Sequence, residues 1–144
     1  MRTLLALLLL LTAGCSSGIA VDTYPMEAGN TLDCKALFAD SPRQVAGLGQ
    51  VLVADRNAAA WGDPAIILRC GVERPSALGA APRCETVADV GWFGESIAGG
   101  RQFTTVGRKF FVSVEVPAEH DPASNALADL ANTVQKHDPL LGPC

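Results

Sequence analysis

The chain has 144 residues, a length that holds one ordinary domain. Hydrophobic residues make up 49% of it and charged residues 18%, which excludes a disordered or collagen-like protein. The formal net charge is −4, so no basic stripe exists to neutralise phosphates, and we expect no nucleic-acid partner.

The N-terminus has the layout of a secretory signal. Arg2 gives a short positive region, and the eight residues of Leu4–Leu11 are apolar without a break. A helix that crosses a membrane needs about 20 such residues, so this run is too short to span and matches the apolar part of a signal peptide. We therefore predict that residues 1–14 are a signal peptide.

Small residues lead directly into a cysteine at the end of this run. The segment Thr12-Ala13-Gly14-Cys15 resembles a bacterial lipobox, whose cysteine receives diacylglycerol and, after cleavage, begins the mature chain. The resemblance implies fatty acyl groups such as palmitate on Cys15, and an exported protein held by lipid at the outer face of the plasma membrane. The alternatives are an ordinary signal peptide with a chance cysteine, or a buried apolar helix.

Four cysteines remain after Cys15, namely Cys34, Cys70, Cys84 and Cys144. An even number in an exported chain predicts two disulfides, for which three pairings exist. We favour Cys70 with Cys84, which would close a loop between two strands, and Cys34 with Cys144, which would tie the first helix to the C-terminus. The competing zinc site lacks a C-x₂-C pair, so we expect no metal.

The sequence of the first half of the mature chain contains few patterns that are typical of helices or strands. Residues 15–30 contain several structure breakers and are expected to form a flexible tether, with one edge segment near Ile19–Val21. The single globular domain would then span residues 31–144. Asp33 can cap a short helix over Cys34–Asp40, which Ser41-Pro42 would stop.

The middle of the chain predicts a series of short elements. Val51–Val53 suits a short strand, Asn57–Ala60 a helical turn, and Trp61–Pro64 a tight turn. Strong strand patterns follow, and the last of them alternates apolar and polar residues after a turn at Gly107. These strands are expected at Ala65–Val72, Ala88–Phe93, Arg101–Val106 and Lys109–Val116.

The C-terminal region predicts the most regular helix. Asp121 can cap it, Pro122 suits its first turn, and its apolar residues recur at helical spacing. One helix stripe that faces one alternating sheet indicates a two-layer α+β fold. We expect an antiparallel meander of about four strands, with the C-terminal helix on one face, a short N-terminal helix and two disulfide staples.

Several segments together resemble an uncharacterised actinobacterial family, the domain of unknown function 3515. The most specific is Trp61–Val72, and Cys34 and Cys144 fit the layout of that family. The resemblance covers nearly all of the mature domain and implies a lipoprotein or exported protein of the actinobacterial envelope, with no activity assigned. The weaker matching segments are Val90-Gly91-Trp92, Thr104–Arg108 and Val114–Pro117.

Catalytic patterns are hard to find in this sequence. His120 and His137 flank the last predicted helix and suit solvated termini, and no G-x-S-x-G elbow is present. No carboxylate pair stands out for sugar hydrolysis, because four acidic residues are equally available: Asp63, Asp89, Glu95 and Glu115. We expect no cofactor.

Five residues form the candidate motif: Trp61, Asp63, Arg69, Trp92 and Arg108. They could be scaffold, with buried tryptophans and arginines that bond turn carbonyls, or they could form a patch that binds an envelope protein or a small molecule. We expect a non-enzymatic binding or accessory module, and the alternative is an envelope hydrolase with carboxylate chemistry. A pocket that holds two carboxylates within about 10 Å would favour the enzyme.

Overall fold

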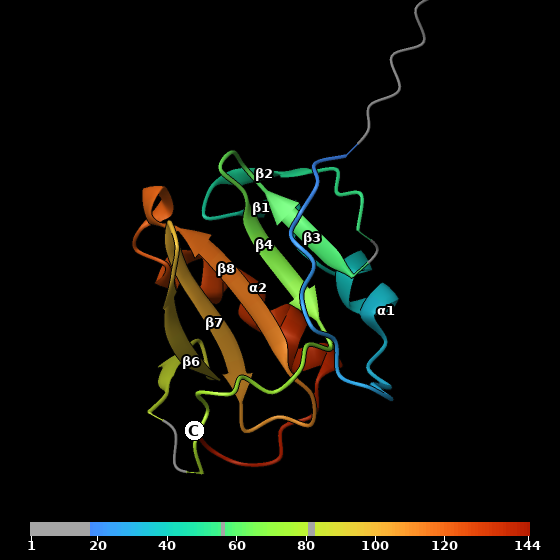
Figure 1. The fold of residues 1–144 in the computed structure, drawn as a ribbon, viewed down its shortest axis with the longest axis vertical. Coiled ribbons are helices and arrows are strands. Elements are labelled where there is room, and N and C mark those ends of the chain that lie inside the picture. The colour runs from blue at the N-terminus through green and yellow to red at the C-terminus, as the bar shows by residue number, and fades with distance from the viewer. Residues whose placement is uncertain (1–17, 56, 81–82) are drawn as a thin grey trace, which may run out of the picture.

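The molecule is built around one sheet of eight antiparallel strands (Figure 1). The computed structural model describes residues 18–55, 57–80 and 83–144. The strands are β1 (Gln44–Val45), β2 (Leu48–Val51), β3 (Ala58–Trp61), β4 (Ile66–Cys70), β5 (Glu85–Val87), β6 (Val90–Ile97), β7 (Gly100–Val106) and β8 (Val112–Pro117). Their order across the sheet is β1-β2-β3-β4-β8-β7-β6-β5.

The expectation of a four-strand meander is wrong. The sheet consists of two four-strand meanders, β1 to β4 and β5 to β8, which join where β4 pairs with β8. The central pair aligns Ile67 with Glu115 and Arg69 with Ser113, although these residues are far apart in the sequence. The two-layer arrangement of helices on one sheet face was expected, but the number of strands and the long-range central pairing were not.

Two helices lie on one face of the sheet (Figure 1). The expected N-terminal helix is present as α1 (Cys34–Ala39), and the Asp33 carboxylate caps it by accepting from the Ala36 amide at 3.0 Å. The C-terminal helix α2 (Ser124–His137) begins later than expected, with Ala123 as its N-cap. Asp121 does not cap it, because this residue is extended and follows the 3₁₀ turn η1 (Ala118–His120).

The ends of the two helices are joined through Asp40, which follows α1. Lys136 and His137, in the last turn of α2, contact its carboxylate at 2.6 and 2.7 Å. The hydrogen bonds from Lys136 and then from His137 lower the pKa of Asp40. His137 is therefore a bonded residue at the helix end and lies 97 positions from its partner.

The main core lies between the sheet and the helices. The apolar stripe of α2, including Leu127 and Leu130, packs on alternate residues of the central strands, such as Leu68 and Val114. A second, smaller core lies on the other face of the sheet and consists of Ala58, Ala60 and Ile67, with Val21, Val51, Val53 and Ala65 packed against it.

Residues 18–27, called the N-terminal segment below, run across the sheet face opposite the helices (Figure 1). Ile19 bridges Val53 and Met26 bridges Val72, so the segment is bonded at both ends. This part of the expected tether is therefore docked on the domain. It also explains why every residue of β4 is buried, since helices cover one face of that strand and the segment covers the other.

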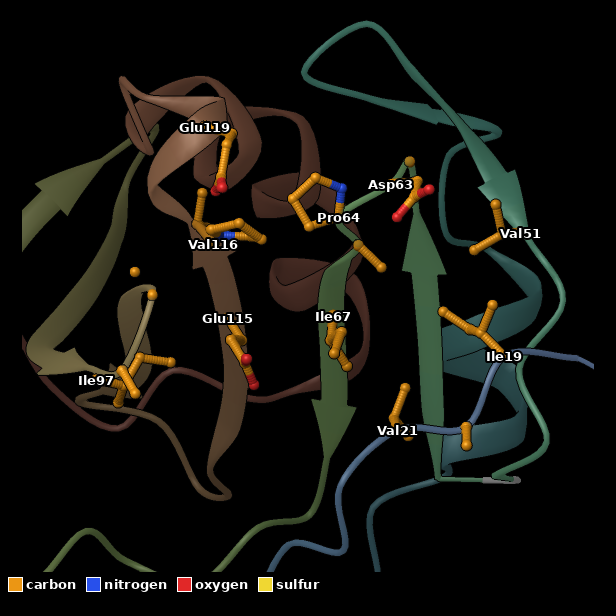
Figure 2. A pocket seen from close by; sticks show the side chains of 17 residues that line it. Ile19, Val21, Val51, Asp63, Pro64, Ile67, Ile97, Glu115, Val116 and Glu119 are labelled. Carbon is orange, nitrogen blue, oxygen red and sulfur yellow. The ribbon is translucent and has the colours of Figure 1, made fainter.

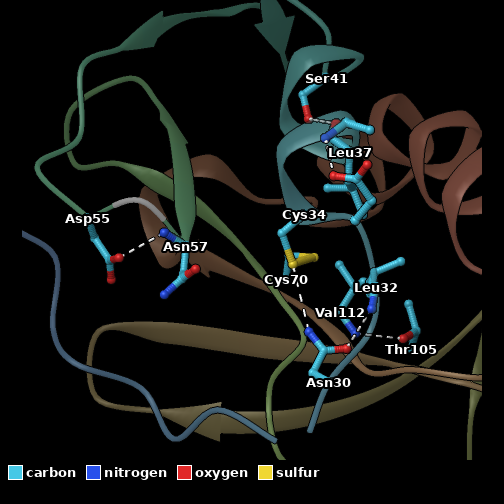
Figure 3. Close-up of a disulfide and its surroundings, with 12 residues drawn as sticks. Asn30, Leu32, Cys34, Leu37, Ser41, Asp55, Asn57, Cys70, Thr105 and Val112 are labelled. Atoms are coloured by element: carbon cyan, nitrogen blue, oxygen red, sulfur yellow. Dashed lines mark hydrogen bonds between the residues drawn. A yellow bond between two sulfur atoms is a disulfide. The ribbon is translucent and has the colours of Figure 1, made fainter.

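The two disulfides are Cys34–Cys70 and Cys84–Cys144, so both expected pairings are wrong. Cys70 ends β4 on the helix side, directly beneath the first residue of α1, and their Cα atoms are 5.6 Å apart (Figure 3). Cys144 returns to the β5–β6 edge, where its side chain lies against Gly91. Cys70 ends β4 in the middle of the sheet, whereas Cys84 directly precedes β5 at its edge, so three strands separate the two cysteines of the expected Cys70–Cys84 bond.

Candidate functional site

The two tryptophans of the candidate motif are core residues. Trp61 and Trp92 are fully buried on the helix side of the sheet. The indole N–H of Trp61 donates to the Pro42 carbonyl oxygen at 2.8 Å, which fixes the chain after α1 to the end of β3. Neither ring is available to a ligand, so these side chains serve the scaffold.

Arg69 lies on the opposite face of the sheet and is only 3% exposed. Its guanidinium pairs with the Glu115 carboxylate at 2.9 Å and donates to the Asp22 carbonyl oxygen at 3.4 Å. It also lies over the Tyr24 ring, 5.3 Å from the ring centre. A buried cation is stable only with such partners, so Arg69 holds the N-terminal segment on the sheet.

Arg108 lies at the far end of the molecule, beside the end of α2. It donates to the Asp138 carbonyl oxygen at 2.6 Å, and the Asp138 carboxylate accepts from the Phe110 amide at 3.1 Å. Burial raises the pKa of Asp138 to about 6, because the charged form loses its hydration. The motif therefore does not assemble into one patch: its residues are divided among the helix-side core, the opposite sheet face and the C-terminal corner.

The structure instead shows a groove of about 630 Å³ on the sheet face opposite the helices (Figure 2). Ile67 of β4 and Glu115 of β8 lie at its centre, and Ile97 lies at the β6–β7 turn on one side. The other side is formed by the N-terminal segment and the end of β2, through Ile19, Val21 and Val51. We refer to this site as the sheet-face groove.

The charged side chains that line the sheet-face groove are all acidic among the described residues. Asp63 and Glu119 are exposed and lie at the same end of the groove, and Glu115 lies on its floor (Figure 2). Glu115 already accepts from Arg69, whereas no ion pair involves Asp63 or Glu119 within the described ranges. The groove thus combines apolar side chains, such as Ile67 and Ile97, with exposed carboxylates, which suits a ligand that carries an apolar group and a cation.

Turns in the sequence position both ends of this groove. The turn after β3 contains Gly62 at a φ of 81°, and His120 of η1 closes on it by donating to the Pro64 carbonyl oxygen at 2.7 Å. At Gly100, a Cβ atom would lie 2.3 Å from the Val116 carbonyl oxygen. Only glycine therefore lets the β6–β7 turn come so close to β8.

Part of this site follows from the sequence. Asp63 belongs to the candidate motif and Glu115 is one of the available carboxylates, whereas no sequence pattern indicates Ile67, Ile97 or Glu119. The missing information is long-range: the groove exists because β4 pairs with β8 and the N-terminal segment docks beside them. The described part of the chain contains no group of three or more potential metal ligands and no helix long and apolar enough to cross a membrane.

Comparison with known families adds one finding. The family described as "Protein of unknown function (DUF3515)" matches residues 3–140. The chain belongs to this family. The match includes every strand and both helices of this DUF3515 protein, together with the sheet-face groove. No curated protein and no solved structure matches the chain.

Proposed function

We propose that this DUF3515 protein is an exported lipoprotein, anchored through Cys15 to the outer face of the plasma membrane, that binds a ligand in the sheet-face groove. The lipobox-like Thr12–Cys15 segment supports the anchor, although residues 1–17 lie outside the described part of the structure. Two disulfides support an oxidising compartment, where such bonds persist.

The groove is the observation that carries this proposal. Its volume of about 630 Å³ suits a small molecule or a few side chains of a partner protein. The floor at Ile67 would take an apolar group, and the exposed carboxylates of Asp63 and Glu119 would attract a cation beside it. We therefore assign the ligand to the class of apolar groups with an amine or guanidinium, such as an exposed Leu-Lys pair of an envelope protein.

Titration with short peptides tests the site. We expect peptides that pair Leu or Ile with Lys or Arg to shift the amide NMR signals of Ile67, Ile97 and Glu119. Ile97→Lys should weaken this binding about ten-fold or more, which corresponds to about 1.4 kcal/mol. The variant loses an apolar contact, and its new positive charge repels the cation of the ligand. Leu141→Lys is the matched control, because Leu141 is exposed and does not line the groove.

Carboxylate hydrolysis is the second candidate, and one observation favours it. Three carboxylates, those of Asp63, Glu115 and Glu119, line the same groove. Hydrolases of this class keep one carboxyl protonated by burial, whereas Asp63 and Glu119 are exposed and Glu115 accepts from Arg69. Turnover of nitrophenyl glycosides that disappears in both Glu115→Gln and Glu119→Gln would replace the binding proposal with the enzyme.

Detergent partitioning tests the anchor. The Cys15→Ala variant should move from the detergent phase to the aqueous phase and keep its unprocessed mass or be released, because no thiol remains to carry diacylglycerol. A variant that stays in the membrane fraction at the mature mass would contradict the lipoprotein part of the proposal.

A further inference from the structure

The chain enters the fold against the loop between β2 and β3. A Cβ atom on Gly18 would lie 2.8 Å from the Leu52 carbonyl carbon, so the two backbones are in contact. The Ile19 amide donates to the Leu52 carbonyl oxygen at 2.8 Å, and the Ala54 amide donates to the Ile19 carbonyl oxygen at 3.1 Å. The first described residues are therefore fixed to this loop.

Large apolar side chains are exposed at this same place. Ile19 is 40% exposed and Leu52 is 67% exposed, and the backbone hydrogen bond makes them neighbours. The other exposed large apolar side chains of the described residues are Leu140 and Leu141. Leu140 bridges Arg108 and Leu141 donates its amide to the Gly107 carbonyl oxygen, a few residues before the C-terminus, which Figure 1 marks well away from the place where the N-terminal segment begins.

The position of the lipid follows from covalent geometry, and this step rests on the proposed anchor at Cys15. Three residue steps separate Cys15 from Gly18, and a fully extended chain covers at most about 11 Å over that distance. The acyl chains would then leave the protein within about 11 Å of the place where Gly18 touches Leu52. That reach is short compared with the thickness of a bilayer, about 40–45 Å with its headgroups, so the Ile19 and Leu52 side chains lie close to the bilayer surface.

We propose that Ile19 and Leu52 form a membrane-contacting edge, which inserts into the bilayer interface and sets the orientation of the domain. Apolar side chains at a bilayer surface reach about 5–10 Å into the boundary between headgroups and acyl chains. The contact is apolar, in keeping with a chain whose net charge of −4 disfavours anionic lipid surfaces. This orientation places the Ile19 end of the sheet-face groove beside the headgroups.

Quenching by brominated lipids tests this orientation. The mature protein, purified after expression of the full chain, would be reconstituted in phosphatidylcholine vesicles with and without bromine on the acyl chains, as Leu52→Trp and, for the matched control, Leu141→Trp. The two native tryptophans are buried and give a common background. We expect brominated lipid to remove about half of the added emission of Leu52→Trp, because its ring reaches the interfacial depth, and to leave that of Leu141→Trp nearly unchanged.

Each other outcome overturns the inference in a different way. Equal quenching of the two variants on protein that sediments with the vesicles would refute the orientation and leave the lipid anchor intact. Protein that does not sediment with the vesicles would refute the anchor itself. A monomer that becomes a dimer through Leu52, detected by sedimentation velocity and lost in Leu52→Ser, would assign the edge to a second copy of the chain.

Discussion

Asp138 is a carboxylic acid that the fold buries completely at the end of α2. One oxygen accepts from the Phe110 amide, whereas the other has no partner among the described residues. Its pKa is raised from 3.8 to about 6, so the folded protein binds this proton more tightly than the unfolded chain does. The resulting stabilisation is complete below about pH 4 and is lost as the pH rises through about 6.

Asp138→Asn should remove this pH dependence. A shift of about two units corresponds to at most about 3 kcal/mol, so this carboxyl should lower the free energy of unfolding of the wild type by up to that amount between about pH 4 and pH 7. The variant resembles the protonated acid and should show a correspondingly flatter profile. Urea unfolding at several pH values measures both, and parallel profiles would contradict the role of this carboxyl.

Trp61 is a second residue whose contribution to the free energy of unfolding can be measured. Trp61→Ala should lower the free energy of unfolding by about 3–5 kcal/mol, because it leaves a large cavity in the core. Trp61→Phe keeps most of the packing and loses the bond to Pro42, so it should cost about 1 kcal/mol from that bond. Thermal melts compare the two variants. A Trp61→Ala melt within about a degree of the wild type would refute the scaffold role.

At the scale of elements, the N-terminal segment depends on a few contacts with the sheet. Tyr24 lies over Arg69 and its hydroxyl bonds the Gln102 side chain, and the Asp22 carbonyl oxygen accepts from Arg69. The Tyr24 ring is therefore one of a few side-chain contacts that hold the middle of the segment. The segment has no regular sheet pairing along its length, only bridges at Ile19 and Met26. Such an element opens locally at a lower cost than the core strands do.

Tyr24→Ala should therefore loosen the segment while the sheet stays folded. We expect amide exchange at Ile19, Glu27 and Glu73 to accelerate about ten-fold, which corresponds to about 1.4 kcal/mol of lost contact, with the amides of β4 and β8 unchanged. Hydrogen exchange followed by NMR measures this. Tyr24→Phe keeps the ring over Arg69 and should show a smaller effect. Uniform acceleration across the sheet would mean that the segment is part of the global folding unit.

The elements that the sequence analysis predicted correctly are those with a strong local period or cap. Both helices were predictable from such features, and so was the strand β8 from its alternating residues. The prediction of a helical turn at Asn57–Ala60 is wrong. It rests on the helix preference of alanine, which tertiary contacts override. In the fold, the alanines of β3 are all buried, and their small side chains let the N-terminal segment and the helices approach the same strand from opposite faces.

The disulfide pairing and the sheet-face groove could not be predicted from the sequence. Each depends on contacts between residues far apart in the sequence, which no local period encodes. The disulfides join residues 36 and 60 positions apart, and the groove needs β4 to pair with β8. A short loop favours a Cys70–Cys84 bond. In the structure Cys70 lies under α1 and bonds Cys34, whereas Cys84 lies beside β5 at the edge of the sheet and bonds Cys144.

At the scale of the whole molecule, the two disulfides reinforce different parts of the fold. Cys34–Cys70 joins α1 to β4 across 36 residues, and Cys84–Cys144 joins the start of the second meander to the C-terminus across 60. By chain entropy, loss of either bond should lower the free energy of unfolding by about 4 kcal/mol. Paired serine substitutions and urea unfolding measure this, and non-reducing peptide mapping should recover these two pairs. A peptide that joins Cys70 to Cys84 would contradict the structure.

The connectivity also has a consequence for biogenesis. Among the four cysteines that follow Cys15, each bond joins sequence neighbours, first with second and third with fourth. On the export route that we propose, Cys15 is taken up by the lipid, and the chain presents Cys34 and Cys70 to the oxidising machinery before Cys84 has appeared. Oxidation in order of emergence therefore produces the native bonds directly, without a step in which a wrong pair must be exchanged.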